Sequence, residues 1–390
     1  MDSKAPPKNS VIHIVGNSKF GGGTTVIFSL IEMARRHGWD AAILSDDPVT
    51  VEAAGKLGID VVEFHGIIRP IRPWVDIKAA LRLSELLRAR KDTVVHTHTL
   101  KGGLVGRWAA RKAGVPIIIH HSHGWSFQDG SVIRKEIMAI LERWGAGYCD
   151  HIISVNQIDI DWALRKKFGA ADKFTYIPNG LCREEIDNVK PTDRSELLRL
   201  IDAPEDCVIL TIVGRLFSEK GHPWLFEALA DLRDRNIKPV HLVVLGDGPH
   251  RDLYEKLIKK NNISNYVHIL GHRPDCRTVA KACDIFVLPS LREGHSISVI
   301  EAMGLGLPII ATDIRGINNS VCHEQQGLLI PPRDSKALAN AIYRLIQDPD
   351  LAYNLGKRAR EKFLQEFTEE KMLSSTWQVY ENLMKEKGMV

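Results

Sequence analysis

Short apolar runs alternate with amphipathic segments of helical length along most of this chain. In the first half, a run at 11–15 precedes the segment 24–37, in which apolar residues recur every three or four positions. That order is typical of βαβ units, whose parallel sheets carry helices on both faces. Further strands of this series are predicted at 41–44, 94–95, 117–119 and 151–155.

A second series of the same kind follows an irregular polar stretch at 188–193. Because 390 residues exceed the usual size of a single hydrophobic core, we expect two Rossmann-like, doubly wound α/β domains that face a central cleft. Their expected bounds are 1–185 and 186–368, and the amphipathic segment 369–390 is expected to form a helix that docks back on the N-terminal domain. The strands of the second series are predicted at 208–213, 241–245, 267–270, 284–288 and 307–311.

Composition narrows the classes of partner. The net charge is only +4, and no basic run is longer than the three residues 165–167, so a nucleic-acid partner is not expected. The six cysteines form no C-x-x-C pair, which favours a reduced, cytoplasmic setting. The first ten residues lack the apolar core of a signal peptide. No segment approaches the roughly 20 apolar residues that span a bilayer.

The stretch 67–91 leaves two interpretations open. It combines apolar residues such as Trp74 with seven Lys or Arg residues, and the first 180 residues carry 24 Lys and Arg against 18 Asp and Glu. Such a segment can rest on an anionic membrane, here the inner face, where a lipid-linked acceptor would be reached. The alternative is an ordinary surface helix that packs on the core by its apolar face.

Glycine-containing turns follow several predicted strands. Gly22 and Gly23 stand before the first helix, where a ligand can approach the backbone closely. Gly246 and Gly248 follow the strand at 241–245, although Asp-Gly and Gly-Pro are also plain turn dipeptides. Neither the dinucleotide fingerprint nor the P-loop pattern is present, so these turns do not define a nucleotide site by themselves.

Charged residues gather in the loops after strands of the second series. Arg215 and Lys220 follow the strand at 208–213. A guanidinium and an ammonium that converge on one point match the charge of a diphosphate. Arg273 follows the strand at 267–270, in a segment that could frame a nucleotide base. These loops are therefore candidates for a phosphate and nucleotide site.

Glu293 and Glu301 lie on either side of a predicted helix start. Ser296 or Ser298 is expected to cap that helix, which places Glu293 in the loop after the strand at 284–288 and Glu301 inside the helix. The free N–H groups of the helix start then lie between the two carboxylates. This arrangement can hold the hydroxyls of a sugar nucleotide, yet acids also occur at such positions because they balance the helix dipole.

Histidines are dense in the first series. They alternate along strands without an acidic or cysteine ligand set and without an H-E-x-x-H pattern, which argues against a metal site. His123, followed by Gly124 beyond the strand at 117–119, is the one best placed to reach a substrate. The others of this group are His96, His98, His120 and His121.

Taken together, these motifs resemble those of the retaining glycosyltransferases of family 4, which have the GT-B fold. The resemblance covers nearly the whole chain and rests on the order and spacing of five motifs. They are Gly21-Gly22-Gly23, His123-Gly124, Gly214-Arg215 with Lys220, Gly246-Asp247-Gly248, and the stretch from Glu293 to Glu301 followed by Ala302-Met303.

The resemblance implies a role for each motif. A nucleotide-diphosphate sugar would be bound mainly by the C-terminal domain, with Arg215 and Lys220 on the diphosphate. Glu301 would hold the ribose hydroxyls and Glu293 those of the transferred sugar. His123 would contact that sugar or orient the reacting centre. Further donor contacts are implied for Gly22, Gly23, Gly246, Gly248, Arg273, Gly294, His295 and Ser296.

The resulting expectation is a metal-independent hexosyl- or N-acetylhexosaminyltransferase without a cofactor. It would transfer a sugar from a UDP donor, with retention and without a carboxylate nucleophile, to a glycan or lipid-linked acceptor in cell-surface polysaccharide synthesis. His295 and Ser296 differ from the apolar residues that many relatives carry after Glu-Gly, so the donor sugar is left open. Two alternatives are a UDP-sugar epimerase with the same fold and a non-catalytic nucleotide-sugar-binding subunit.

Overall fold

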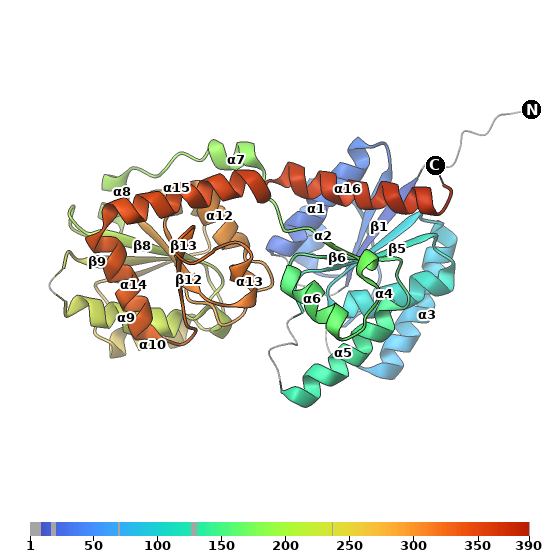
Figure 1. The fold of residues 1–390 in the computed structure, drawn as a ribbon, viewed down its shortest axis with the longest axis horizontal. Coiled ribbons are helices and arrows are strands. Elements are labelled where there is room, and N and C mark those ends of the chain that lie inside the picture. Colours follow the sequence, from blue (N-terminus) through green and yellow to red (C-terminus); the bar gives the residue numbers. More distant parts are fainter. Residues whose placement is uncertain (1–8, 17–20, 69–70, 126–130, 236, 390) are drawn as a thin grey trace, which may run out of the picture. The chain divides into compact units, whose positions relative to one another are not determined.

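The computed structural model describes residues 9–16, 21–68, 71–125, 131–235 and 237–389. The chain divides into two compact units, Met1–Asn179 with Glu369–Val390, and Gly180–Thr368. Each unit contains a parallel sheet covered by helices (Figure 1). The predicted fold class, two Rossmann-like α/β domains, is therefore confirmed.

The first unit is built on a seven-stranded sheet in the order β3-β2-β1-β4-β5-β6-β7. Its two three-residue strands, β3 and β7, were not predicted because so short a run shows no periodicity. The strands are β1 (Ser10–Gly16), β2 (Asp40–Ser45), β3 (Asp60–Val62), β4 (Val94–His98), β5 (Ile117–Ser122), β6 (His151–Ser154) and β7 (Phe174–Tyr176). The helices are α1 (Gly22–Arg36), α2 (Pro48–Lys56), α3 (Pro73–Arg90), α4 (Leu100–Ala113), α5 (Val132–Ala146), α6 (Gln157–Arg165) and α16 (Glu369–Glu386).

Strands β4 and β5 continue three residues beyond their predicted ends, to His98 and Ser122. The prediction stopped where histidine and threonine replace apolar residues. In the structure these polar side chains are buried on both faces of the sheet, and the parallel pairing runs through to His98 and His121. Polar burial, rather than a strand end, explains the change of pattern.

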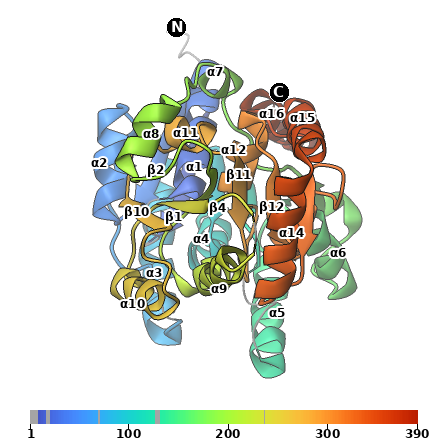
Figure 2. The ribbon, with the colours of Figure 1, turned by 90° about the vertical axis from the view of Figure 1, so that its left-hand side faces the viewer.

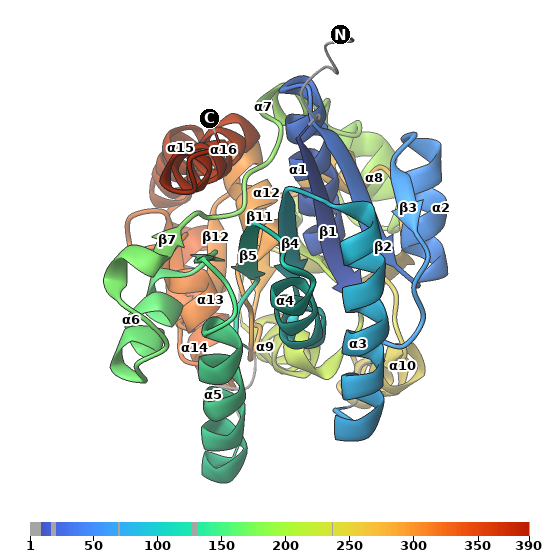
Figure 3. The same ribbon diagram turned by 90° about the vertical axis from the view of Figure 1, so that its right-hand side faces the viewer.

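Helix α4 packs between α3 and α5 (Figure 3). A buried ion pair joins α4 to α5: Arg107 Nη2 lies 2.8 Å from Glu142 Oε2, and the two side chains are 0% and 1% exposed. Arg107 also donates from Nε to the carbonyl of Gly103 at 2.8 Å. A buried charge that loses its partner costs several kcal/mol, so this pair fixes α5 against the rest of the unit.

We expect Glu142→Gln to lower the free energy of unfolding by about 3–5 kcal/mol, because it leaves the Arg107 guanidinium buried without a counter-charge. Urea denaturation measures the change. The matched control on the same helix is Glu136→Gln, whose pair with Lys166 is exposed and is worth less than about 1 kcal/mol. Equal losses for both variants would contradict the assignment.

The second unit has a six-stranded parallel sheet in the order β10-β9-β8-β11-β12-β13. Figure 2 labels three of these strands, β10, β11 and β12. The five predicted strands of this series are confirmed, and β13 was not predicted. The strands are β8 (Val208–Val213), β9 (Val240–Leu245), β10 (Val267–Gly271), β11 (Ile285–Leu288), β12 (Ile309–Thr312) and β13 (Gly327–Ile330). The helices are α7 (Arg183–Asp187), α8 (Arg194–Leu200), α9 (His222–Arg233), α10 (Arg251–Lys260), α11 (Cys276–Lys281), α12 (Ile297–Leu305), α13 (Arg315–Asn318), α14 (Ser335–Gln347) and α15 (Pro349–Glu366).

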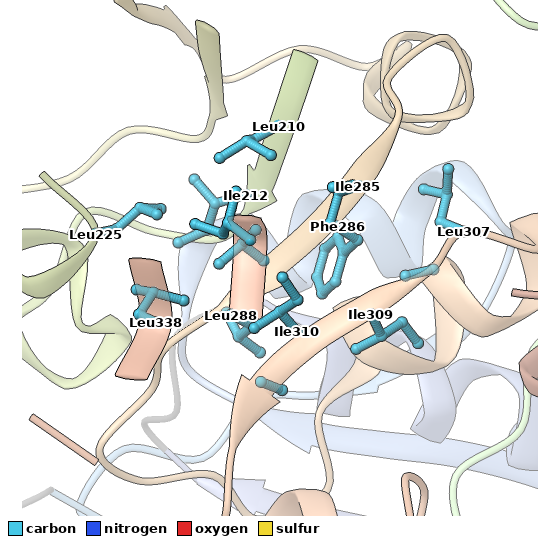
Figure 4. Close-up of a cluster of buried hydrophobic side chains, with 14 of the residues drawn as sticks. Leu210, Ile212, Leu225, Ile285, Phe286, Leu288, Leu307, Ile309, Ile310 and Leu338 are labelled. Atoms are coloured by element: carbon cyan, nitrogen blue, oxygen red, sulfur yellow. The ribbon is translucent and has the colours of Figure 1, made fainter. Parts of the chain in front are cut away.

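Apolar side chains from both faces of the central strands hold this second sheet between its helices. Phe286 of β11 is 1% exposed, and Ile310 of β12 is fully buried in the same cluster (Figure 4). Leu225 of α9 and Leu338 of α14 pack into it. The cluster keeps the carboxyl ends of β8 and β11 at fixed positions, and these are the ends from which the charged loops start.

The boundary between the units lies at Asn179–Gly180, earlier than the expected boundary at 185. The residues that follow belong to the second unit because they bond and pack there. The backbone N–H of Leu181 donates to the carbonyl of Phe367 at 3.0 Å, and Ile186 of α7 is buried in the second core. At the other end of the chain, α16 belongs to the first unit, where it packs along α1.

Candidate functional site

Strands β8 and β11 are neighbours at the centre of the second sheet. The chain leaves β8 towards β9 on one side, whereas β11 is followed by β12 on the other. Such a reversal of strand order opens a crevice at the carboxyl ends of the strands, where α/β folds bind ligands. The loops after β8 and β11 carry Arg215, Lys220 and Glu293, so the sequence-predicted charges are brought to this point.

Lys220 and Glu293 form an ion pair across these two loops. Lys220 Nζ lies 2.8 Å from Glu293 Oε1, and the side chains are 20% and 11% exposed. Ser290 Oγ donates to the same carboxylate oxygen at 2.7 Å, and the carbonyl of Ser290 accepts a hydrogen bond from Thr312 Oγ1. Sequence reasoning missed Ser290 and Thr312 because a serine and a threonine at strand ends are common in loops of any function.

Two glycines allow the backbone to approach closely around the loops after β8 and β11. Gly316 of α13 lies so near Glu293 that a Cβ would stand 2.2 Å from the Glu293 carbonyl oxygen. Gly221 has φ +77° and leaves only 1.8 Å between a Cβ and the carbonyl oxygen of Pro289. Both contacts exclude any larger residue. The position of Glu293 is therefore set by the backbone, which a sequence without a structure does not reveal.

Arg215 is exposed, and its guanidinium lies over the Phe217 ring, 4.9 Å from the ring centroid. Tyr254 Oη in turn donates to the carbonyl of Phe217 at 3.0 Å. Among the residues that the structure describes, no carboxylate pairs with Arg215. Its donors are thus available to an anion while its position is held by the aromatic ring.

Gly246 and Gly248 have a packing reason to be glycine. A Cβ on Gly246, where φ is +149°, would lie 2.0 Å from the carbonyl oxygen of Gly214, and one on Gly248 would lie 2.7 Å from that of Leu216. The backbone N–H of Leu216 also donates to the carbonyl of Asp247 at 3.0 Å. The glycine turn after β9 therefore supports the loop that carries Arg215.

Glu301 lies in α12, as predicted, and is paired with a residue that sequence reasoning missed. Arg277 Nε is 2.8 Å from Glu301 Oε1, and Arg277 Nη1 is 2.9 Å from Glu185 Oε2. Beside this pair is a cavity of about 10 Å³ with Val213 and Leu305 in its lining, room for one water molecule. Arg277 thus orients the carboxylate, and the Glu301 side chain remains 15% exposed.

The start of α12 differs from the prediction in one respect. Ser296 is the N-cap residue, but neither it nor Ser298 caps the helix by a side-chain hydrogen bond; their hydroxyls lie 3.3 Å apart instead. The predicted position of the cap is therefore confirmed for Ser296, but the capping hydrogen bond is not formed, because its hydroxyl lies beside that of Ser298. The N–H groups of the first turn therefore lack a side-chain acceptor from their own N-cap.

His295 and Arg273 are engaged within the second unit. His295 Nε2 is 3.0 Å from Ser320 Oγ, and burial, together with Lys362, lowers the pKa of His295 to about 3, so the ring is neutral. Arg273 forms two hydrogen bonds, at 2.9 and 2.7 Å, with the carboxylate of Asp275. Gly294, beside His295, stays in the loop that carries Glu293.

In the first unit, His123 follows the end of β5 and is half-buried. Its Nε2 lies 3.1 Å from His98 Nδ1, and burial lowers the pKa of His123 to about 4. At neutral pH it therefore offers a neutral donor and acceptor rather than a charge. Gly22 and Gly23 form the exposed first turn of α1, where a Cβ on Gly23 would meet no atom of the described residues within 4 Å.

Comparison with known proteins agrees with this geometry. The family described as glycosyl transferases group 1 matches residues 193–362, and a glycosyl transferase 4-like domain matches residues 21–180. The chain is 31% identical over 318 residues to the UDP-Gal:alpha-D-GlcNAc-diphosphoundecaprenol alpha-1,3-galactosyltransferase of Escherichia coli, covering 80% of this chain and 81% of that protein. It is 23% identical over 385 residues to the capsular polysaccharide biosynthesis glycosyltransferase CapM of Staphylococcus aureus, covering 96% and 98%.

Among solved structures, Anabaena HepE in complex with UDP superposes with a TM-score of 0.80 at 20% identity, covering 96% of this chain and 100% of that one. Two Rossmann-like domains of this kind define the GT-B class of glycosyltransferases. This chain belongs to the glycosyl transferases group 1 family, and it is a glycosyltransferase of glycan synthesis.

Proposed function

We propose that this protein transfers a sugar, with retention of configuration, from a UDP-sugar to a lipid-linked or glycan acceptor of a cell-surface polysaccharide. The observation that carries the proposal is the group formed by Arg215 and the Lys220–Glu293 pair at the carboxyl ends of β8 and β11. The named activity of the Escherichia coli relative and the UDP in the HepE structure support the choice of UDP.

In this reaction the bond between the anomeric carbon and the phosphate oxygen breaks, and its electron pair stays on the diphosphate. The leaving group gains negative charge as the sugar becomes oxocarbenium-like. Arg215, which has no carboxylate partner among the described residues, and Lys220 would stabilise that charge. These two cations supply the compensation that a divalent ion gives in other enzymes, so we propose that transfer needs no metal.

The pairing of Glu293 supports retention without a covalent intermediate. Its Oε1 is held by both Lys220 and Ser290, which suits a carboxylate that binds sugar hydroxyls better than a free nucleophile. The acceptor oxygen would attack the anomeric carbon on the face that the phosphate leaves, and its proton would pass to the departing phosphate oxygen. Glu301, oriented by Arg277, would bind the ribose hydroxyls.

Thermal-shift measurements with UDP-, GDP- and ADP-sugars test the donor. A ligand that binds only the folded protein raises its stability by mass action, by about 2.7 kcal/mol at 100 times Kd, and we expect a UDP-sugar to give the largest shift. Transfer is then followed with the best donor and a lipid-linked sugar, and NMR of the product reports its anomeric configuration.

The same assay separates the alternatives. Interconversion of the UDP-sugar without an acceptor would indicate an epimerase, and binding without transfer to any acceptor would indicate a binding subunit. The absence of a thermal shift with every nucleotide sugar would contradict the proposed function. A product with inverted anomeric configuration would contradict the retaining mechanism.

An enzyme that acts on a lipid-linked acceptor must contact the membrane surface. The first unit has exposed side chains that suit such a contact. No described helix is long and apolar enough to cross a bilayer. Helices α3 and α5, which flank α4 (Figure 3), instead expose large apolar side chains: Trp74 is 81% and Ile133 75% exposed. Ile137, Ile140 and Trp144 continue the exposed face of α5. The exposed cations Lys78, Arg82, Arg88 and Arg143 stand on the same two helices.

Apolar side chains flanked by cations are the features by which helices lie in an anionic interface. We expect the protein to sediment with liposomes that contain phosphatidylglycerol, and the variant Trp74→Ser/Ile137→Ser to bind them at least tenfold more weakly. The matched control, Leu253→Ser/Tyr353→Ser, removes exposed apolar residues of the second unit and should bind as the parent does. Equal binding by all three proteins, or none to anionic lipid, would contradict the membrane contact.

A further inference from the structure

Five histidines lie together on one face of the first sheet. They alternate along the chain with residues that face α4. They are His13 of β1, His96 and His98 of β4, His121 of β5, and His123 just after β5. Because side chains on a strand repeat every two residues, all five rings point to the same side. Four of them are at most 1% exposed, and His123 is half-buried.

The hydrogen bonds of this cluster are incomplete. His98 joins two neighbours, His13 at 3.0 Å and His123 at 3.1 Å, and His96 Nδ1 is 2.7 Å from Tyr380 Oη. Of the ten ring nitrogens, five have no partner within the described part of the chain, including both nitrogens of His121. A buried polar group without a partner costs about 1–3 kcal/mol, so this arrangement calls for a ligand.

Neutral imidazoles with free lone pairs are ligands for divalent transition-metal ions. Two groups of three histidines place one nitrogen each within 4.8 Å of one another: His13, His96 and His98, and His98, His121 and His123. Metal–nitrogen bonds of about 2.0–2.1 Å in a tetrahedral site require nitrogens about 3.3 Å apart, close to the observed separation of His98 and His123.

We propose that His98, His121 and His123 bind one divalent transition-metal ion of the Zn²⁺ type. The bound ion inhibits the enzyme because it holds His123 away from the transferred sugar, the contact that the family resemblance implies for this residue. This group is preferred to the other because half-buried His123 gives an ion a path of entry. It also uses His121, whose two nitrogens are both without a partner among the described residues. A water molecule would fill the fourth position, as in other sites with three histidine ligands.

His13 has a supporting role. In the tautomer in which His98 Nε2–H donates to His13 Nδ1, neutral His98 presents the lone pair of Nδ1 towards His123. Partners that hold the second nitrogen of a metal-bound histidine typically contribute 10- to 100-fold to metal affinity. This proposal reverses the expectation from the sequence, which argued against a metal because no acidic or cysteine ligand set accompanies the histidines. The three proposed ligands come from two strands and the segment after one of them, and their proximity is seen only in the fold.

The test uses tag-free protein titrated with Co²⁺, whose tetrahedral complexes absorb in the visible, followed by displacement with Zn²⁺. We expect one ion per chain, loss of the signal in His121→Gln, and about 10- to 100-fold weaker binding in His13→Gln. The matched control is His268→Gln, which removes one member of a hydrogen-bonded, partly buried histidine pair of the second unit, His241 and His268, and should bind Co²⁺ as the parent does. Circular dichroism of the metal-free variants reports that they are folded.

The binding arm requires no glycosyl transfer, so it stands or falls independently of the proposed function. Absence of saturable binding, or equal binding by folded His121→Gln, would overturn the site. The inhibition arm rests on the proposed function: Zn²⁺ should abolish turnover at the concentration that fills the site, and a chelator should restore it. Turnover that is unchanged with the site filled would overturn the role given to His123.

Discussion

Lys220→Met is expected to lower kcat by about 100- to 1,000-fold with a much smaller change in the KM for the donor. The lysine would act mainly on charge that develops on the leaving diphosphate, and removal of one preorganised stabilising group in other enzymes costs about 2.7–4 kcal/mol. Because Lys220 Nζ also holds Glu293 at 2.8 Å, the double variant Lys220→Met/Glu293→Gln should lose less than the product of the two single losses.

The matched control for this prediction is Lys256→Met on α10, an exposed lysine in the same unit. It should keep the turnover of the parent. Melting temperatures of all variants show whether a loss of activity reflects a loss of fold. A Lys220→Met enzyme that is folded and retains turnover within about threefold of the parent would remove the central argument of the proposed function.

Acid is expected to lower the free energy of unfolding of this protein as the pH falls from about 6.5 to 5. Burial lowers the pKa of His13 in the first unit to about 3, and burial with Lys362 lowers that of His295 in the second unit to about 3. In the unfolded chain both pKa values return to about 6.5. Each of these histidines then removes up to about 2 kcal/mol of stability at pH 5.

The direction follows from the two protonation states. Above pH 6.5 both histidines are neutral whether the chain is folded or not, so their full contribution to stability is present. As the pH falls from 6.5 towards the pKa of about 3 that these histidines have in the folded protein, the unfolded state binds protons and the folded state does not. The free energy of unfolding therefore decreases. Urea denaturation at pH 7.5, 6.0 and 5.0 measures the change. A free energy of unfolding that is constant over this range would contradict the buried neutral state of the two histidines. In the variant His295→Asn, the free energy of unfolding should fall less steeply with decreasing pH than in the parent.

Much of the fold was readable in the sequence because the apolar runs of a buried parallel sheet are long and uninterrupted. The strand predicted at 208–213 became β8 without a shift, and the one predicted at 284–288 became β11, one residue shorter at its start. The hydrophobic pattern failed where polar residues are buried. Strand β4, for example, carries His96, Thr97 and His98 inside the unit. Periodicity also says nothing about strands of three residues such as β3.

The sequence allowed prediction of those site residues whose side-chain chemistry by itself suggests a role. Lys220 and Glu293, 73 residues apart in the chain, were both named from their positions after strands, and the structure brings them together. Gly316 and Arg277 were missed because their importance lies in which backbone or carboxylate they touch across the fold. A glycine in a short helix and an arginine on a surface helix give no signal in a single sequence.

The return of α16 to the first unit has a consequence for how the protein is made. Its Trp377 stacks on His37 with ring centroids 3.7 Å apart, and Tyr380 reaches His96 of the central strand β4. A ribosome therefore finishes the first sheet long before it supplies the helix that carries Trp377 and Tyr380. The whole of Gly180–Thr368 is translated in between. Until then the nascent first unit lacks the hydrogen bond between Tyr380 and His96. The unit whose synthesis begins first is therefore the last to be completed.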